Sequence, residues 1–214
     1  MTRSRTVDFS GYTWEVKSST GVVGPGPNYF SNSVDNVWVD GLGRLHLKVT
    51  HSKRRWYSAE VINTQSLGRG CYRFELDSAV DALDPNVVLG LFTWSDDPAY
   101  NNRELDIEFG RWGNAADRTN GQYVVQPYDH AGNLQRITQP AASSSAHWFD
   151  RQANAVTFGS SAAAPSSWTY AGSALPQPGS EHVRMNLWLY RGAPPLNGRS
   201  VEVVVSRFTF TPAP

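Results

Sequence analysis

The stretch HVRMNLWLY, residues 182–190, alternates strictly between two kinds of side chain. The apolar set consists of Val183, Met185, Leu187 and Leu189. The other set is polar or aromatic and consists of His182, Arg184, Asn186, Trp188 and Tyr190. A period of two is typical of a β-strand, because successive side chains point to opposite faces. The stretch therefore predicts a strand with one face in a hydrophobic core.

Similar short runs recur along the chain. Alternation or apolar clustering predicts strands at 36–39, 44–49, 71–76, 87–94, 104–109, 122–126, 155–158 and 201–210. Glycine and proline residues separate these runs, and no segment shows helical periodicity over three turns. Many short, half-buried strands with turn residues between them indicate an all-β sandwich or barrel.

Length and composition narrow the class of protein. The 214 residues contain no composition break or repeat, which predicts a single domain, 1–214. The 19 basic and 19 acidic residues cancel, so no basic surplus favours nucleic acid or an acidic membrane face. Cys71 is the single cysteine, which excludes an intrachain disulfide. No apolar run reaches the length of about 18 residues that spans a membrane.

Aromatic residues are unusually frequent in the chain, and two of them lie on the predicted outward face of the strand 182–190. The chain has eight Trp, nine Tyr and nine Phe. At 182–190, Trp and Tyr stand beside Asn, Arg and His, where an ordinary solvent face would carry Lys, Thr, Ser and Glu. Stacking rings beside hydrogen-bonding groups favour a binding surface for a flat, uncharged ligand such as a sugar. The alternative is a face covered by a loop or by the other end of the chain.

The motif with the clearest chemistry is ELDIEF, residues 104–109. Positions i, i+2 and i+4 of a strand share one face, so Glu104, Asp106 and Glu108 line up about 6–7 Å apart. Neighbouring like charges are unfavourable in a strand, which indicates a function. Crowding raises the pKa of at least one carboxyl, and glycoside hydrolysis needs one ionised and one protonated carboxyl. The spacing leaves retention and inversion open, and a Ca²⁺ or Mg²⁺ site or an inert acidic face remain alternatives.

The ELDIEF string resembles the active-site strand, Glu-x-Asp-x-Glu, of glycoside hydrolase family 16, the laminarinase and lichenase group. Further segments are similar to the family in the same order along the chain. They are residues 24–31 and 36–40, 57–59 and 62–64, 68–75, 91–94 and 185–188. The resemblance covers about residues 12–212. It departs from the pattern at Arg103, where relatives commonly have an acidic residue, and in the segment 147–170.

The resemblance implies a concanavalin A-like jelly roll, a two-sheet antiparallel β-sandwich with a concave cleft for a polysaccharide. It implies Glu104 as nucleophile, Asp106 as assisting carboxylate and Glu108 as general acid/base in a retaining endo-hydrolysis of β-glucan, with β-1,3 or mixed β-1,3-1,4 linkages favoured. The residues expected to bind substrate are Asn28, Asn63, Trp94, Trp112, Gln126, Tyr128, Asn186 and Trp188. The alternative is a non-catalytic, lectin-like carbohydrate-binding protein on the same fold.

The resemblance also sets expectations for partners and location. It implies an enzyme that needs no cofactor and a site without metal ligands. It also allows a structural calcium ion, which some relatives bind on the convex side through backbone oxygens. The expected partner is a polysaccharide, with no nucleic acid and no membrane, and the expected state is a monomer. The first residues lack an apolar signal segment. The substrate class nevertheless predicts an extracellular or periplasmic setting.

Overall fold

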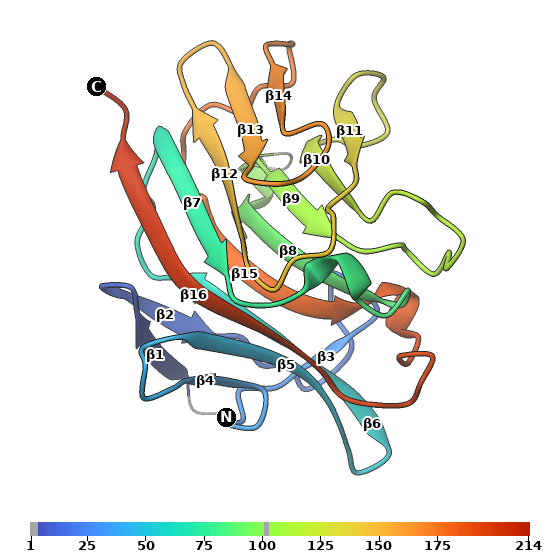
Figure 1. Cartoon of the computed structure of the whole chain (residues 1–214). Coiled ribbons are helices and arrows are strands. Elements are labelled where there is room, and N and C mark those ends of the chain that lie inside the picture. The colour runs from blue at the N-terminus through green and yellow to red at the C-terminus, as the bar shows by residue number, and fades with distance from the viewer. Residues whose placement is uncertain (1–3, 101–102) are drawn as a thin grey trace.

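Two antiparallel sheets pack face to face in the computed structural model, which describes residues 4–100 and 103–214 (Figure 1). The first, here called the cleft sheet, has the strand order β1 (Arg5–Phe9), β2 (Tyr12–Val16), β6 (Arg55–Asn63), β15 (His182–Leu189), β8 (Val87–Trp94), β9 (Leu105–Phe109), β10 (Gly121–Val125) and β11 (Leu134–Ile137). The predicted all-β, two-sheet jelly-roll sandwich is confirmed.

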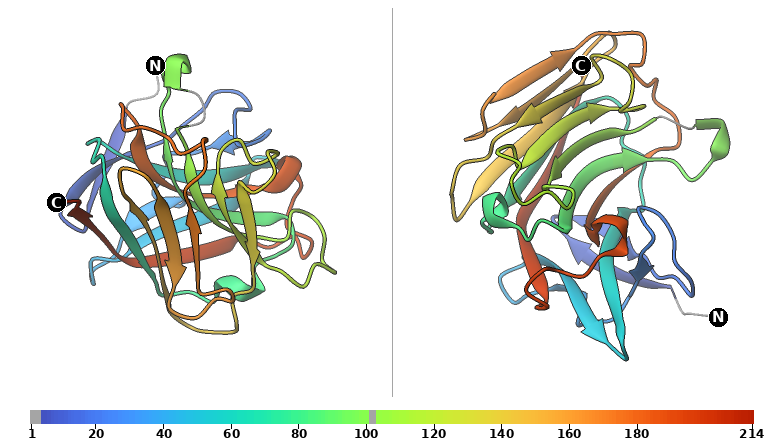
Figure 2. Two further views of the ribbon diagram at one scale, coloured as in Figure 1. Left: turned by 90° about the horizontal axis from the view of Figure 1, so that it is seen from above. Right: turned by 90° about the vertical axis from the view of Figure 1, so that its right-hand side faces the viewer.

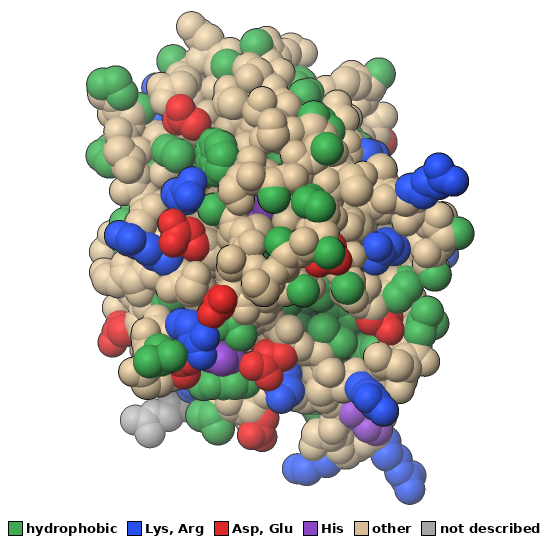
Figure 3. All heavy atoms as spheres, viewed as in Figure 1, with side chains coloured by type: hydrophobic (Ala, Val, Ile, Leu, Met, Phe, Trp, Pro, Cys, Tyr) green, Lys and Arg blue, Asp and Glu red, His purple; other side chains and the backbone are tan. Residues whose placement is uncertain are grey.

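The second sheet, here called the back sheet, has the order β4 (Val37–Val39), β5 (Leu45–Ser52), β16 (Val201–Pro212), β7 (Gly70–Leu76), β12 (Ser145–Arg151), β13 (Val156–Ser160) and β14 (Ser167–Tyr170). The hairpin between β5 and β6 joins the two sheets, and β3 (Tyr29–Phe30) runs parallel to β6. Figure 2 shows the two sheets as stacked layers. Figure 3 looks onto the back sheet, where acidic and basic side chains are interspersed.

The core lies between the sheets and takes side chains from both ends of the chain. One cluster of buried residues extends from Phe9 to Phe208. Ring contacts link the two layers: Trp14 of β2 meets Phe208 of β16 at a centroid distance of 5.3 Å, and Tyr123 of β10 stacks on Phe158 of β13 at 5.3 Å. Burying such large rings supplies much of the hydrophobic stabilisation.

The strand alternation read from the sequence matches the observed faces. In β15, the apolar set at 183, 185, 187 and 189 is at most 1% exposed and belongs to the core cluster. Tyr190 differs from the prediction, because β15 ends at Leu189 and Tyr190 begins a short 3-10 turn, Tyr190–Gly192. The segment 147–170, which departs from the family pattern in sequence, forms the regular strands β12, β13 and β14.

Helical structure is confined to short turns in the described part of the chain. These are the 3-10 turns Val80–Ala82, Pro98–Tyr100 and Tyr190–Gly192. Among residues 4–100 and 103–214, no helix has the length and apolar character needed to cross a membrane.

A buried ion pair fastens the segment before β15 to the back sheet. Arg151 of β12 and Glu181 are each 1% exposed, and their side chains form a short ion pair. Arg151 Nη2 also donates to the Pro176 carbonyl at 2.9 Å, and Glu181 Oε2 accepts from the Gly179 amide at 2.6 Å. Both charges are thereby compensated inside the protein, as buried charges must be.

We predict that Arg151→Met lowers the free energy of unfolding by about 3–5 kcal/mol, because it leaves the Glu181 carboxylate buried without its partner. Urea unfolding at pH 7 measures the loss. The double variant Arg151→Met/Glu181→Leu should recover part of it. The control, Arg73→Met, breaks the exposed Arg73–Glu75 pair and should cost about 1 kcal/mol or less. An equal cost for both single variants would contradict the prediction.

Candidate active site

A cavity of about 600 Å³ opens on the outer face of the cleft sheet. Strands β9, β8, β15 and β6 form its floor, and the segment 17–25 lines it from one side. The floor residues are Glu104, Asp106, Glu108, Gly90, Phe92, Trp94, Arg184, Asn186, Trp188, Glu60 and Ile62. The cavity is thus lined by acidic, basic and aromatic side chains.

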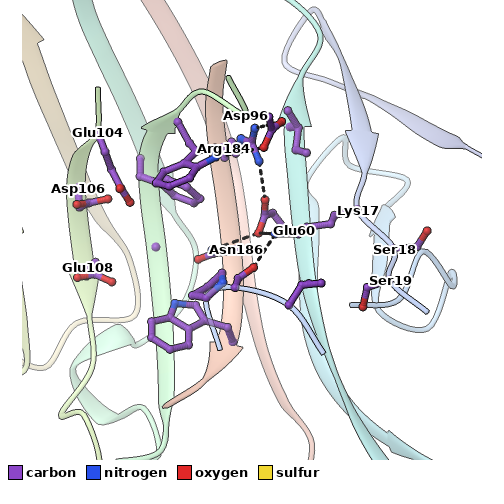
Figure 4. Close-up of a pocket in the computed structure, with 18 residues that line it drawn as sticks. Lys17, Ser18, Ser19, Glu60, Asp96, Glu104, Asp106, Glu108, Arg184 and Asn186 are labelled. Atoms are coloured by element: carbon purple, nitrogen blue, oxygen red, sulfur yellow. Dashed lines mark hydrogen bonds and ion pairs between the residues drawn. The ribbon is translucent and has the colours of Figure 1, made fainter. Parts of the chain in front are cut away.

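The predicted row of carboxyls lies along one edge of this cavity. Glu104, Asp106 and Glu108 point to the same side, toward β8 and β15 (Figure 4). The alternate residues Leu105, Ile107 and Phe109 are fully buried in the core. Burial of that opposite face determines the direction of the row, because in a strand a one-residue slip would exchange the two faces.

Burial and mutual repulsion make the carboxyls hard to ionise. Burial raises the pKa of Glu104 to about 7, and the charge of Glu108 adds to this effect. Burial, together with the charges of Glu104 and Glu108, raises the pKa of Asp106 well above its ordinary value. Burial also raises the pKa of Glu108. Three carboxyls in such contact titrate as a coupled set.

Two glutamine amides, one in β10 and one directly after its end, reach the row. Gln122 Nε2 donates to Glu108 Oε2 at 2.6 Å, and Gln126 Nε2 donates to Asp106 Oδ2 at 3.0 Å. The register explains the first contact, since Gln122 lies directly opposite Glu108. Gln126 was predicted as a site residue and Gln122 was not. The alternation at 122–126 was the signal for it, because both residues occur at even positions of one strand.

A chain of ion pairs crosses the floor on the other side of the cavity. Glu60 Oε2 lies 2.9 Å from Lys17 Nζ, and Glu60 Oε1 lies 3.3 Å from Arg184 Nη1. Arg184 Nη2 lies 2.6 Å from Asp96 Oδ2. Figure 4 shows this chain facing the carboxyl row. Sequence reasoning did not identify it, because the four residues come from distant segments whose pairing depends on strand register.

Aromatic side chains flank the row, as predicted for two of them. Trp94 and Trp188 both line the cavity, and Phe92 joins them. The Trp94 indole donates to Asp96 Oδ1 at 3.2 Å, and Trp188 packs against Phe30 and Val88. The lining thus combines aromatic rings with hydrogen-bonding groups, as small-molecule sites commonly do.

The cavity floor also includes the predicted residue Asn186, packed closely on its neighbour strand. Its Nδ2 lies 3.5 Å from Glu60 Oε2. A Cβ atom on Gly90 of β8 would lie 2.5 Å from Asn186 Oδ1. Glycine at position 90 therefore makes the room in which the Asn186 amide lies.

Two residues expected to contact substrate are placed elsewhere. Asn28 is 3% exposed, its Nδ2 donates to the Leu189 and Pro25 carbonyls, and its Oδ1 accepts from Ser58 Oγ. Asn63 is fully buried, and its Oδ1 accepts from the Gln65 amide. The alternation of β6 explains the second difference, because Glu60 and Ile62 face the cavity and Asn63 therefore faces the core. Both amides serve the fold, which corrects the expectation.

The remaining predicted residues, Trp112 and Tyr128, lie outside the cavity lining, as does Gln126. Trp112 has a left-handed backbone (φ 45°), packs against the cluster of Phe30, Val88 and Trp188, and lies under the Arg136 guanidinium at 4.4 Å. Tyr128 is 64% exposed, beyond the end of β10. A left-handed conformation is rare for a bulky side chain and is often found at functional sites.

No set of three His, Cys, Asp or Glu side chains within residues 4–100 and 103–214 is arranged to hold a metal ion. This finding includes the carboxyl row, which was one of the alternatives for a cation site. Calcium binding through backbone oxygens stays a prediction.

We predict that the carboxyl row makes stability fall with rising pH. Glu104 binds a proton more tightly in the folded state than in the unfolded state, so the stabilisation is present below the unfolded pKa and is lost as pH rises through about 7. Glu104→Gln should therefore be about 1–3 kcal/mol more stable than the wild type at pH 8 and equally stable at pH 4. Urea unfolding at both pH values checks this. Glu75→Gln, on the exposed back sheet, is the matched control and should show no such difference.

No protein-family model matches the chain, and no curated protein matches it in sequence. Solved structures do match over nearly the whole fold. A β-glucanase of Bacillus licheniformis is 20% identical, with 98% of each chain covered and a TM-score of 0.73. A β-1,3-1,4-glucanase (lichenase) from a mouse hindgut metagenome is 19% identical, with 94% of this chain and 93% of that chain covered and a TM-score of 0.70.

A third similar structure is described as an immunostimulatory antigen and pseudo β-1,3-glucanase of Mycobacterium tuberculosis. It is 18% identical, with 92% of this chain and 91% of that chain covered and a TM-score of 0.67. At these identities the likeness is one of fold. The resemblance to the laminarinase and lichenase group is confirmed at that level: the chain has the jelly roll of the β-glucanases.

Proposed function

We propose that the protein is a glycoside hydrolase that cleaves β-glucan internally and with retention of configuration. The observation that carries the proposal is the row Glu104, Asp106 and Glu108 along an open cavity with Trp94 and Trp188. Paired carboxyls with raised pKa values beside ring faces suit glycoside hydrolysis, which needs a nucleophile and a proton donor in one site.

The environments of the carboxyls support different roles. Asp106, with the pKa raised well above its ordinary value, holds a proton and shares a hydrogen bond with Glu104. That bond favours the ionised form of Glu104, which then attacks the anomeric carbon as nucleophile. Glu108 keeps its proton until it gives it to the leaving oxygen, and it then takes a proton from the water that releases the sugar.

The extent of the floor supports a polysaccharide substrate. From β9 the cavity crosses β8, β15 and β6, which is three strand spacings or about 14 Å. A floor of this width has room for several sugar units on one side of the row, which suits a long chain as substrate. The β-1,3-1,4-glucanase among the similar structures supports the choice of β-1,3 or mixed linkages. For a polysaccharide-degrading enzyme we also propose a monomer in an extracellular or periplasmic setting.

We predict that Glu104→Gln and Glu108→Gln each lower kcat/KM on lichenan or laminarin by about 10²–10⁴-fold, because each removes a group that acts in the transition state. Affinity electrophoresis on the same glucans should show that binding is retained. Glu75→Gln is the control and should keep full activity. Proton NMR of the first product formed should show the β-anomer, as expected for retention.

The alternative function, a lectin-like binder, predicts tight glucan binding by the wild type with no turnover. That result would overturn the proposal, and one similar structure is itself described as a pseudo β-1,3-glucanase. Loss of wild-type activity with a chelator would instead indicate a metal-dependent reaction.

We predict a bell-shaped dependence of kcat/KM on pH, with an acid limb near pH 7. Glu104 must be ionised, and its pKa is raised to about 7, so activity should fall as pH drops below that value. Glu108 must be protonated, and its raised pKa moves the alkaline limb above the usual carboxyl range. An acid limb near pH 4, the ordinary carboxyl range, would contradict this assignment.

A further inference from the structure

Three side chains on neighbouring strands form a line that leads away from the carboxyl row. Glu108 of β9 lies opposite Gln122 of β10, and Gln122 lies opposite Arg136 of β11. Gln122 Nε2 donates to Glu108 Oε2 at 2.6 Å, and Arg136 Nη1 donates to Gln122 Oε1 at 3.1 Å. Arg136 thus reaches Glu108 through one amide.

The chemistry of the two partners allows one orientation of that amide. A guanidinium donates hydrogen bonds and accepts none, so it requires the amide oxygen of Gln122. The NH₂ group is then left to face Glu108. Without Arg136, the amide could turn over and present its oxygen to Glu108, which would suit the protonated carboxyl alone.

Arg136 is itself held from three directions. Its Nη2 lies 2.9 Å from Asp117 Oδ2, and its Nε donates to Thr119 Oγ1 at 2.9 Å. Its guanidinium lies over the Trp112 ring at 4.4 Å, next to the left-handed backbone of that residue. Thr119 Oγ1 also donates to Asp117 Oδ1 at 2.7 Å. These contacts fix the guanidinium, so the orientation of the amide is built into the fold.

We propose that Arg136 is a positioning residue, which orients the Gln122 amide so that its NH₂ group holds and polarises the carboxyl of Glu108. Its role in catalysis rests on the proposed function, in which Glu108 is the general acid/base. No hydrogen bond joins Arg136 directly to the Glu108 carboxyl in the described part of the chain, so the hydrogen-bonded route between them runs through Gln122.

Apart from Gln122 and Arg136, the groups that face Glu108 are two carboxyls of the same row and a glycine. On its own strand it is faced by Asp106 and Glu104, and a negative charge on Glu108 raises the pKa of both of these carboxyls. Its neighbour on β8 is Gly90, which has no side chain. The Gln122 hydrogen bond and the positive charge of Arg136 lower the pKa of Glu108 against the effect of burial. Removing Arg136 should therefore raise the pKa of Glu108.

The test compares the pH dependence of kcat/KM on lichenan for the wild type and three variants. Arg136→Met should move the alkaline limb upward by about 0.5–1 pH unit and lower kcat about tenfold with little change in KM. Arg136→Lys keeps a donor toward the amide oxygen and should restore part of both effects. Arg73→Met, which removes an arginine over the Trp148 ring on the back sheet, is the matched control and should match the wild type. Superimposable profiles for Arg136→Met and the wild type would overturn the proposal.

A double-mutant cycle separates the amide from a through-space effect of the charge. In a Gln122→Met background, Arg136→Met should shift the alkaline limb far less than it does in the wild type. An undiminished shift there would show that the charge acts directly and would overturn the positioning role.

Failure of the proposed function is distinguishable from failure of this inference. NMR titration of ¹³C-labelled glutamate carboxyls, with Glu108 assigned by its absence in Glu108→Gln, follows the same group without any substrate. A wild type that cleaves no glucan would end the proposed function, while an upward shift of the Glu108 titration in folded Arg136→Met would still support the inference. An unmoved titration would overturn it.

Discussion

The site depends on keeping three acidic side chains together on one face of one strand. Such crowding is unfavourable, and it persists because the opposite face of β9 is locked into the core by Leu105, Ile107 and Phe109. The strand has no alternative register that would separate the carboxyls without exposing these apolar side chains. The stability of the sandwich thus holds an arrangement that the row would not adopt by itself.

The surroundings then make three similar groups behave differently. A hydrogen bond with Glu104 and the amide of Gln126 act on Asp106, whereas the amide of Gln122 acts on Glu108. Gln122 lies in β10, which runs beside the row, and Gln126 directly follows the last residue of that strand. Two neutral hydrogen-bond donors therefore lie beside the row, one bonded to Glu108 and one to Asp106.

Sequence reasoning could predict what depends on local periodicity. The faces of Trp188 and Asn186 and the shared face of the row follow from alternation within one strand, and the structure has them so. Asn63 was misjudged because alternation was not applied through the segment 55–63, where it points to Glu60. The prediction for Asn63 was therefore wrong by one residue. Adjacent side chains of a strand face opposite sides, so a shift of one position moves a side chain from the cavity to the core.

What could not be predicted depends on pairing between distant segments. The contact of Arg184 with Glu60 joins residues 124 positions apart, and the link from Glu108 to Arg136 requires the register of two strand pairs. The position of Asn28 likewise depends on its long-range partner, the Leu189 carbonyl. Composition and spacing carry no information about such partners.

The hydrogen bonds of Asn28 affect how the cavity can bind a ligand. Its single amide ties the base of the segment 17–25 to Ser58 of β6 and to the end of β15. The side wall of the cavity is therefore fastened to two strands of its floor. This end of the wall is thus held by the protein itself, so the conformational entropy of ordering it does not have to be lost when a ligand binds.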